Sequence, residues 1–216
     1  MPVIITDGTT ALKADNTYDA MRVCYYPAEL SSKHIVAMSS GALTVVSSGT
    51  TNIVAAIRQI DSASVIQIRR IGLSWVTTTG FTGAQYLDFG VYIARSYSGS
   101  SSGGTPWSSA SNNGKLRTSL GTPTNLDARI ATTSALTAGT FTADAYPIAQ
   151  IGCWCTTAAG GTGVIPLNWL VDQGPGDYPI ILAQNEGLVV CPMTTMGAGG
   201  VGTLTLIVEG CSSATY

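Results

Sequence analysis

The stretch from Ser64 to Val76 reads SVIQIRRIGLSWV, and it decides how this chain folds. Ile66 and Ile68 lie two residues apart, so in a β-strand they share one face. The next three large apolar residues fall in the opposite phase: Ile71, Leu73 and Trp75. Because side chains alternate strictly, a regular strand of this length would turn half of its hydrophobic residues to water.

One extra residue at Arg69 and Arg70 restores the phase, so we predict a β-bulge there. Bulges bend long strands that pass from one sheet to another or round a barrel corner. We expect the two arginines at the bend, with at least one reaching solvent or a buried carboxylate. We expect Arg69 and Arg70 to have a structural role in the strand. Because they are the one adjacent basic pair in the chain, they are also candidate interaction residues.

Strand signals recur along the chain, whereas helical periodicity is almost absent. Short β-rich runs at 21–26, 43–46 and 53–60 are bounded by Ser, Gly or Asn clusters. Alternation at 87–93 predicts a half-buried strand, and 201–209 predicts a second one, which we place centrally in its sheet. We therefore predict an all-β fold, a two-sheet antiparallel sandwich of jelly-roll type with long Ser/Gly-rich loops.

Composition favours one ordered domain. The chain has 216 residues, 45% of them hydrophobic, and a mean hydropathy of +0.28, which excludes a disordered chain. No apolar run approaches the ~20 residues of a membrane span, and the N-terminus lacks the features of a signal peptide. We expect a single β-sandwich domain over 21–216, preceded by an N-terminal arm or extended segment over 1–20. Its cysteines should be reduced thiols made in a cytoplasm.

The charge content is unusually low. Asp, Glu, Lys and Arg make up 10% of the chain, where about 25% is usual. The net charge of −2 and the pI of about 5.2 argue against nucleic acid as a partner. Ser, Thr and Gly must then cover much of the surface. Such a surface is polar enough to be hydrated, but it carries too little charge to keep copies of the chain apart by electrostatic repulsion. This predicts a surface that other protein chains cover.

The longest low-complexity connection runs from Ser98 to Gly114 and reads SGSSSGGTPWSSASNNG. Loops of this length usually have a function or are pinned by a neighbour. Trp107 is the informative residue, because a tryptophan in such a loop is either a local plug or an anchor in a contact with another chain. The sequence allows both alternatives, and Trp107 is a candidate interaction residue.

Motifs that resemble catalytic chemistry lack the context that the chemistry needs. Residues 197–202 match the dinucleotide fingerprint, but a strand and not a helix follows them. Residues 99–103 match a nucleophile elbow, yet the single histidine, His34, lies upstream. The run from Asp172 to Asp177 resembles a calcium loop without its bidentate Glu, so a turn is favoured. We predict no catalytic residues, no cofactor and no enzyme activity.

Cysteines and aromatic residues leave two further alternatives. Cys153 and Cys155 share one face of a strand, which could begin a metal site, but small buried hydrophobic residues are the favoured interpretation, and we predict no metal. Aromatic residues could instead bind a carbohydrate, although core packing and interfaces account for most of them. The candidates are Tyr25, Tyr26, Tyr92, Tyr97, Trp107, Trp154 and Trp169.

Several segments resemble a family of tailed-bacteriophage virion structural proteins that are associated with the capsid. The segments span much of 64–209, and they are 112–119, 129–139, 178–182, 185–190 and 202–209. The resemblance is in word order and composition. Val208 stands where family members tend to place an aromatic residue, and the cysteines at 153, 155 and 191 are also departures. The resemblance implies a non-enzymatic virion component and assigns no functional residues.

Composition and resemblance together give the expected function. We expect a structural protein of the phage particle, a minor capsid protein that decorates or cements the capsid through many subunit contacts. The expected partners are the major capsid protein or other virion proteins. We also expect a homo-oligomer, with a trimer favoured. We expect no nucleic acid and no membrane among the partners. The chain should be made in the host cytoplasm and reside in the virion. The alternative is a tail or fibre module that binds a host-surface glycan.

Overall fold

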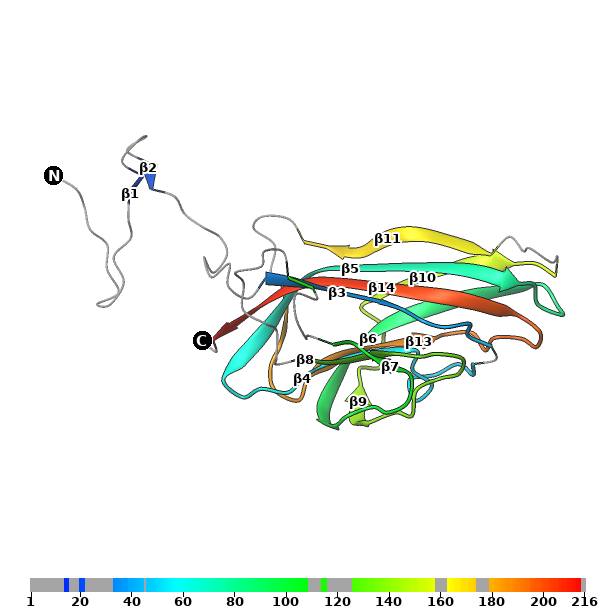
Figure 1. The fold of residues 1–216 in the computed structure, drawn as a ribbon, viewed down its shortest axis with the longest axis horizontal. Coiled ribbons are helices and arrows are strands. Elements are labelled where there is room, and N and C mark those ends of the chain that lie inside the picture. The colour runs from blue at the N-terminus through cyan, green and yellow to red at the C-terminus, as the bar shows by residue number, and fades with distance from the viewer. Residues whose placement is uncertain are drawn as a thin grey trace.

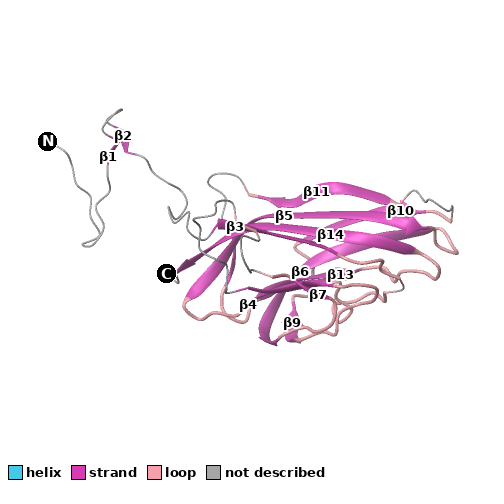
Figure 2. Ribbon diagram, in the orientation of Figure 1, coloured by secondary structure: helices cyan, strands magenta, loops and turns pink. Residues whose placement is uncertain are grey.

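The computed structural model describes residues 14–15, 20–21, 33–44, 46–108, 114–115, 126–157, 163–173 and 179–214. Every helix or strand assigned among these residues is a β-strand, as Figure 2 shows, so the all-β prediction is confirmed. β1 (Ala14–Asp15) and β2 (Ala20–Met21) pair with each other. The predicted arm over 1–20 and the predicted strand at 21–26 lie for the most part outside the described residues.

Two antiparallel sheets make up the body of the molecule, and Figure 1 shows them as two layers. The five-stranded sheet has the order β11-β5-β14-β3, and β12 also pairs with β5. Its strands are β3 (Lys33–Ser39), β5 (Ser64–Thr79), β11 (Val164–Asp172), β12 (Ile180–Leu182) and β14 (Val201–Ala214). β14 lies between β3 and β5, which confirms the central position predicted for 201–209.

The seven-stranded sheet has the order β10-β6-β13-β4-β8-β7, and β9 also pairs with β6. Its strands are β4 (Ala55–Gln59), β6 (Gln85–Gly99), β7 (Thr105–Pro106), β8 (Leu126–Ile130), β9 (Thr140–Ala143), β10 (Ala149–Cys155) and β13 (Gly187–Pro192). β4 lies within the run predicted at 53–60, and β6 contains the strand predicted at 87–93.

Antiparallel pairs are nested along the chain. β3 pairs with β14, β4 with β13, β5 with β11 and β12, and β6 with β10. From β3 to β6, successive strands alternate between the two sheets. The main partners are therefore far apart in sequence, which is the pattern of a slowly folding, non-local β-topology.

The core lies between the two sheets and joins them. Leu73 and Trp75 of β5 are fully buried, and the Trp75 ring lies 5.3 Å from that of Phe89 on β6, measured between centroids. Leu204 and Leu206 of β14 enter the same cluster. Each of these residues occupies the inward position of the alternation that the sequence shows, so the hydrophobic pattern selects which face is buried.

The β-bulge predicted at the two arginines is confirmed by the pairing of β5 with β14. Arg70 lies opposite Glu209, and Ile68 lies opposite Gly210, so Arg69 is the extra residue. On both sides of it the large apolar side chains are buried: Ile66, Ile68, Ile71, Leu73 and Trp75. One inserted residue therefore lets a 16-residue strand keep both of its halves against the core.

Two local predictions need correction. The described residues of the run 43–46, which are 43, 44 and 46, form no strand: Leu43 makes a single bridge to Gly202, while its side chain and that of Val46 fill the core. Within the predicted run, β6 is half-buried only near Tyr86, because residues 90–94 are buried on both faces. Met193, from the segment after β13, and Tyr92, from β6 itself, lie over Gly90 on its outer side, and alternation within the strand does not reveal the cover by Met193.

Candidate functional site

The two arginines at the bulge point to different partners. Arg69 donates from Nη2 to the carbonyl oxygen of Gln173 at 3.3 Å. Arg70 donates from Nε to Oδ1 of Asp172 at 2.7 Å, and its Nη1 lies 3.9 Å from Oε2 of Glu209. The side chain of Arg70 remains 43% exposed, which confirms that at least one arginine reaches solvent. The hydrogen bond to Asp172 and then its charge raise the pKa of Arg70 above its usual value.

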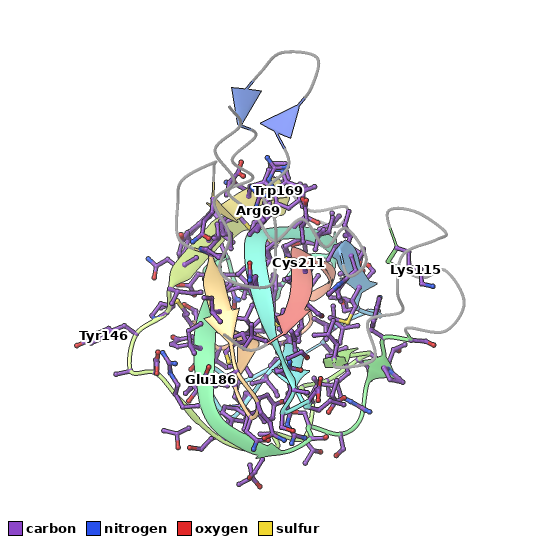
Figure 3. The ribbon with its side chains drawn as sticks, turned by 90° about the vertical axis from the view of Figure 1, so that its left-hand side faces the viewer. Arg69, Lys115, Tyr146, Trp169, Glu186 and Cys211 are labelled. Carbon is purple, nitrogen blue, oxygen red and sulfur yellow. The ribbon has the colours of Figure 1, made fainter. Side chains whose placement is uncertain are left out.

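Beside Arg70, apolar side chains gather on the outer face of the five-stranded sheet. The guanidinium of Arg70 lies 5.3 Å from the ring centroid of Trp169, in cation–π contact. Trp169 and Leu167 both lie over Gly72, where an added Cβ would come within 3.0 and 3.1 Å of them. Figure 3 labels Trp169 and Arg69, both toward the top of the view.

The apolar surface continues along β11 and β5. Val164 lies directly opposite Val76, and the two are 53% and 46% exposed. Leu167 and Trp169 are exposed as well. We call these four residues, Val76, Val164, Leu167 and Trp169, the β11 patch. Exposed hydrophobic residues that adjoin one another on a sheet are typical of a protein–protein contact.

The edge of the sheet beside the patch does not invite strand addition. β11 is the edge strand, and its register with β5 shifts between Ile165 and Asn168 and again between Trp169 and Val171. Pro166 lies in the first irregular stretch and has no N–H to donate. Bulges and proline are devices that prevent edge-to-edge pairing. A partner would therefore meet the side chains of the β11 patch and not its backbone.

Trp107 lies apart from the arginines. Its backbone N–H donates to the carbonyl oxygen of Ala128 on β8. Its ring lies beside Gly114, whose carbonyl oxygen accepts from the backbone N–H of Ile35 on β3. The side chain is half-buried and packs against the core between the open edges of the two sheets. This packing favours the local plug. β14 separates β3 from the arginine-bearing β5, so the three candidate residues do not form one site.

The loop that begins at Ser98 is held by hydrogen bonds over its first residues. Ser101 is buried, its hydroxyl pairs with that of Tyr97, and it accepts from the N–H of Gly139 at 3.2 Å. Ser102 exchanges two backbone hydrogen bonds with Thr137, each 3.0 Å long. This part of the loop is therefore held by neighbouring segments, which is one of the two alternatives for a long loop. Ser101, the middle residue of the 99–103 motif, is buried and is not an accessible nucleophile.

Cys153 and Cys155 point inward from β10, and their sulfur atoms are 3.7 Å apart, so the predicted shared face is confirmed. Burial, followed by the charge of Cys155, raises the pKa of Cys153 to about 12. Burial raises the pKa of Cys191 to about 12 as well. Across the described ranges, no group of three or more His, Cys, Asp or Glu side chains could hold a metal ion. The cysteine pair is packed as small apolar residues are.

The raised thiol pKa values predict a loss of stability in alkali. A thiol whose pKa lies at about 12 in the fold and near 9.0 when unfolded stabilises the fold below pH 9, and this contribution is lost as the pH rises toward 12. We expect the urea midpoint to fall between pH 8 and about pH 10.5, and to fall less in Cys191→Ala, which lacks the thiol. An equal fall in both proteins would show that Cys191 does not contribute.

A shallow polar cavity of about 440 Å³ lies between β6 and the turn before β13. It is lined by Ser96, Ser98, Ala183, Gln184, Asn185 and Glu186. Arg95 nearby donates to Glu186 at 2.8 Å and to both oxygens of Asp144 at 3.2 Å, so one guanidinium is shared between two carboxylates. The arginine ties together β6, the segment after β9 and the β12–β13 turn.

Of the aromatic candidates, Trp154 and Trp169 are exposed, whereas Tyr92 and Tyr97 are buried and so are not accessible to a carbohydrate. Tyr25 and Tyr26 lie outside the described residues. The sequence interpretation missed Tyr86, which is 49% exposed and lies directly opposite Trp154, itself 59% exposed. The alternation of β6 already places Tyr86 outward, but its pairing with Trp154 depends on the register of β6 and β10.

Comparison with known proteins gives no match to a family model or to a curated protein. Among the residues that the structure describes, there is no helix of the length and apolarity that crossing a membrane requires.

Proposed function

We propose that this chain is a non-enzymatic structural component of a bacteriophage particle, a minor capsid protein that decorates or cements the capsid. The β11 patch carries the proposal. It exposes Val164, Leu167 and Trp169 next to an ion-paired arginine on a sheet whose edge resists strand pairing. Covering such a face removes apolar area from water at little cost in desolvated charge.

The strand order supports a jelly roll, the sandwich type found in many viral capsid domains. A jelly roll arises when a long antiparallel ribbon of nested strand pairs is rolled up so that successive pairs enter opposite sheets. The nested pairs β3–β14, β4–β13, β5–β11 and β6–β10 match this ribbon. The contacts β14–β5 and β13–β6 then join the rolled pairs into sheets. β7, β8 and β9 are additions at the margins of the seven-stranded sheet.

Low charge supports an assembled working state. With 10% charged residues, the surface offers little electrostatic repulsion between copies. We propose that the β11 patch contacts the major capsid protein or another virion protein, and that the chain forms a closed homo-oligomer, with a trimer favoured. Many weak contacts over a lattice then retain it on the particle. The chain would be made in the host cytoplasm and reside in the virion.

The experiment places charge on the patch in particles whose genome encodes the chain. Val164→Lys combined with Leu167→Lys should preserve folding, because both side chains are exposed, and should lower the number of copies per purified particle at least about tenfold. Mass spectrometry against the major capsid protein measures this number. The matched control is Tyr146→Lys with Ile148→Lys, which adds the same charge at exposed residues elsewhere. Unchanged occupancy in the patch variant would refute the proposed contact.

A tail or fibre module that binds a host glycan is the second candidate. The exposed pair of Tyr86 and Trp154 on the seven-stranded sheet favours it. Copy number separates the two candidates, because a capsid lattice needs hundreds of copies, whereas a tail needs a handful. A stoichiometry typical of a tail in the wild-type particle would favour the second.

A further inference from the structure

Tyr86 and Trp154 form an aromatic surface on the outer face of the seven-stranded sheet. They lie directly opposite each other on β6 and β10, so their side chains leave the sheet on the same face. The neighbouring Leu87 is fully buried and Cys155 likewise, which places the aromatic pair on the side away from the core.

The ring of Tyr86 lies down across the sheet. A Cβ added at Gly152, the residue opposite Asp88, would come within 2.6 Å of Cζ and Oη of Tyr86 and 2.8 Å of Cβ of Asp88. The phenol end therefore lies over the Gly152 backbone, and the 49% exposure of Tyr86 leaves its other side to solvent. Any side chain at position 152 would displace the Tyr86 ring. Gly152 therefore allows this ring to lie flat against the sheet with one side exposed to solvent.

Polar groups follow the aromatic pair along the same face. Asp88 comes next on β6, and Gln150 lies exposed on β10 opposite Gly90. No group in the described part of the chain hydrogen-bonds the enclosed Oδ1 of Asp88. Beyond Gly90 the surface is closed by Tyr92 and Met193, whose atoms lie within 2.7 and 3.1 Å of the position of an added Cβ.

We infer that this surface, Tyr86 and Trp154 with Asp88 and Gln150 beside them, binds a neutral hexose unit of a glycan. The C–H groups on one face of a pyranose ring carry partial positive charge and stack on the negative face of an aromatic ring. The hydroxyl groups at its rim are donors and acceptors that suit a carboxylate and a carboxamide. A few placed polar groups beside an apolar surface are typical of such sites.

Charge selects the ligand class. Asp88 adjoins the aromatic pair in a chain with a net charge of −2, so sialylated, sulfated or phosphorylated ligands are disfavoured. Nucleobases also stack on aromatic rings, but the phosphate backbone that accompanies them is repelled in the same way. This site does not depend on the proposed capsid role, because it belongs to the other sheet and needs no partner chain.

The test uses the purified full chain and four neutral tetrasaccharides, of glucose in its β-1,4 and α-1,4 forms, of mannose and of galactose, with sialyllactose as the charged comparison. Saturation-transfer NMR and titration of tryptophan fluorescence should show binding of at least one neutral probe, and weaker binding of sialyllactose. Trp154→Ala and Tyr86→Ala should each lower affinity at least about fivefold, whereas Tyr86→Phe keeps the ring and should retain most of it. Gly152→Ala should weaken binding by displacing the ring.

Trp169→Ala is the matched control, since it removes an exposed tryptophan from the other sheet. Failure of every neutral probe to bind at about 10 mM would overturn the inference, and so would an equal loss of affinity in Trp169→Ala. The number of copies per particle distinguishes a failure of the sugar-binding inference from a failure of the proposed capsid function. Trp154→Ala should leave occupancy unchanged, whereas lysines in the β11 patch should lower occupancy and leave sugar binding intact.

Discussion

Deletion of Arg69 is expected to destabilise the protein by about 5 kcal/mol, enough to unfold many domains of this size. Without the extra residue, one half of β5 must shift by one position against β14. The shift turns Ile66 and Ile68 away from the core and brings Gln67 toward it. Displacing buried isoleucines costs about 1.5–3 kcal/mol each, and the Gln67 amide, which is already buried on the opposite face of β5, would enter the apolar core at a further cost.

The control for this deletion is Arg69→Ala, which keeps the residue count and therefore the bulge. It loses the 3.3 Å hydrogen bond to the carbonyl of Gln173 and should cost no more than about 1 kcal/mol. Urea unfolding followed by tryptophan fluorescence compares the two variants with the parent. If the deletion were as stable as Arg69→Ala, the bulge would not be what keeps β5 in phase.

Replacement of Trp75 with alanine has the second largest expected effect, a loss of about 4 kcal/mol in the free energy of unfolding. Trp75 is fully buried, contacts Phe89 across the core, and donates from Nε1 to Oγ1 of Thr77 at 2.9 Å. Its ring also fills the space above Gly202, where an added Cβ would lie 2.2 Å from Cζ2. The variant leaves a cavity between the two sheets and deprives the Thr77 hydroxyl of a donor.

Trp154→Ala is the matched control for this substitution, because Trp154 is exposed on the outer face of β10. It should change stability by no more than about 1 kcal/mol. Thermal or urea unfolding of the two variants gives the comparison. Similar losses in both would mean that the site of Trp75 collapses to fill the space, contrary to the close packing of this core.

The strands could be predicted where their own alternation determines which face is buried. β5, with its bulge, and β14 can be predicted because alternating apolar residues mark the buried face in both halves of β5 and along β14. The strand predicted at 43–46 was wrong because Leu43 and Val46 are buried in a connection, and a buried connection has the same apolar composition as a short strand. The outer face of β6 is closed at Gly90 because Met193, from the segment after β13, and Tyr92, from the same strand, lie over it, and the contact with Met193 cannot be read from alternation.

The candidate sites were predicted less completely than the fold. Arg70 was expected at the surface, but its stacking on Trp169 required the pairing of β5 with β11. The sequence allows two roles for Trp107, and the contacts that hold it against the core come from the backbone of Ala128 and from Gly114. The pairing of Tyr86 with Trp154 cannot be read from the sequence, because the two residues lie on different strands, 68 positions apart in the chain.

The sequence by itself determined the all-β class, the need for a bulge at Arg69 and the scarcity of surface charge, because alternation and composition are local properties that no neighbour can change. Tertiary structure alone decided that Trp169 rests over Gly72 and that Tyr86 lies beside Trp154. Those contacts depend on the register between strands that are distant in the chain, and a shift of one residue would turn each of these side chains to the opposite face.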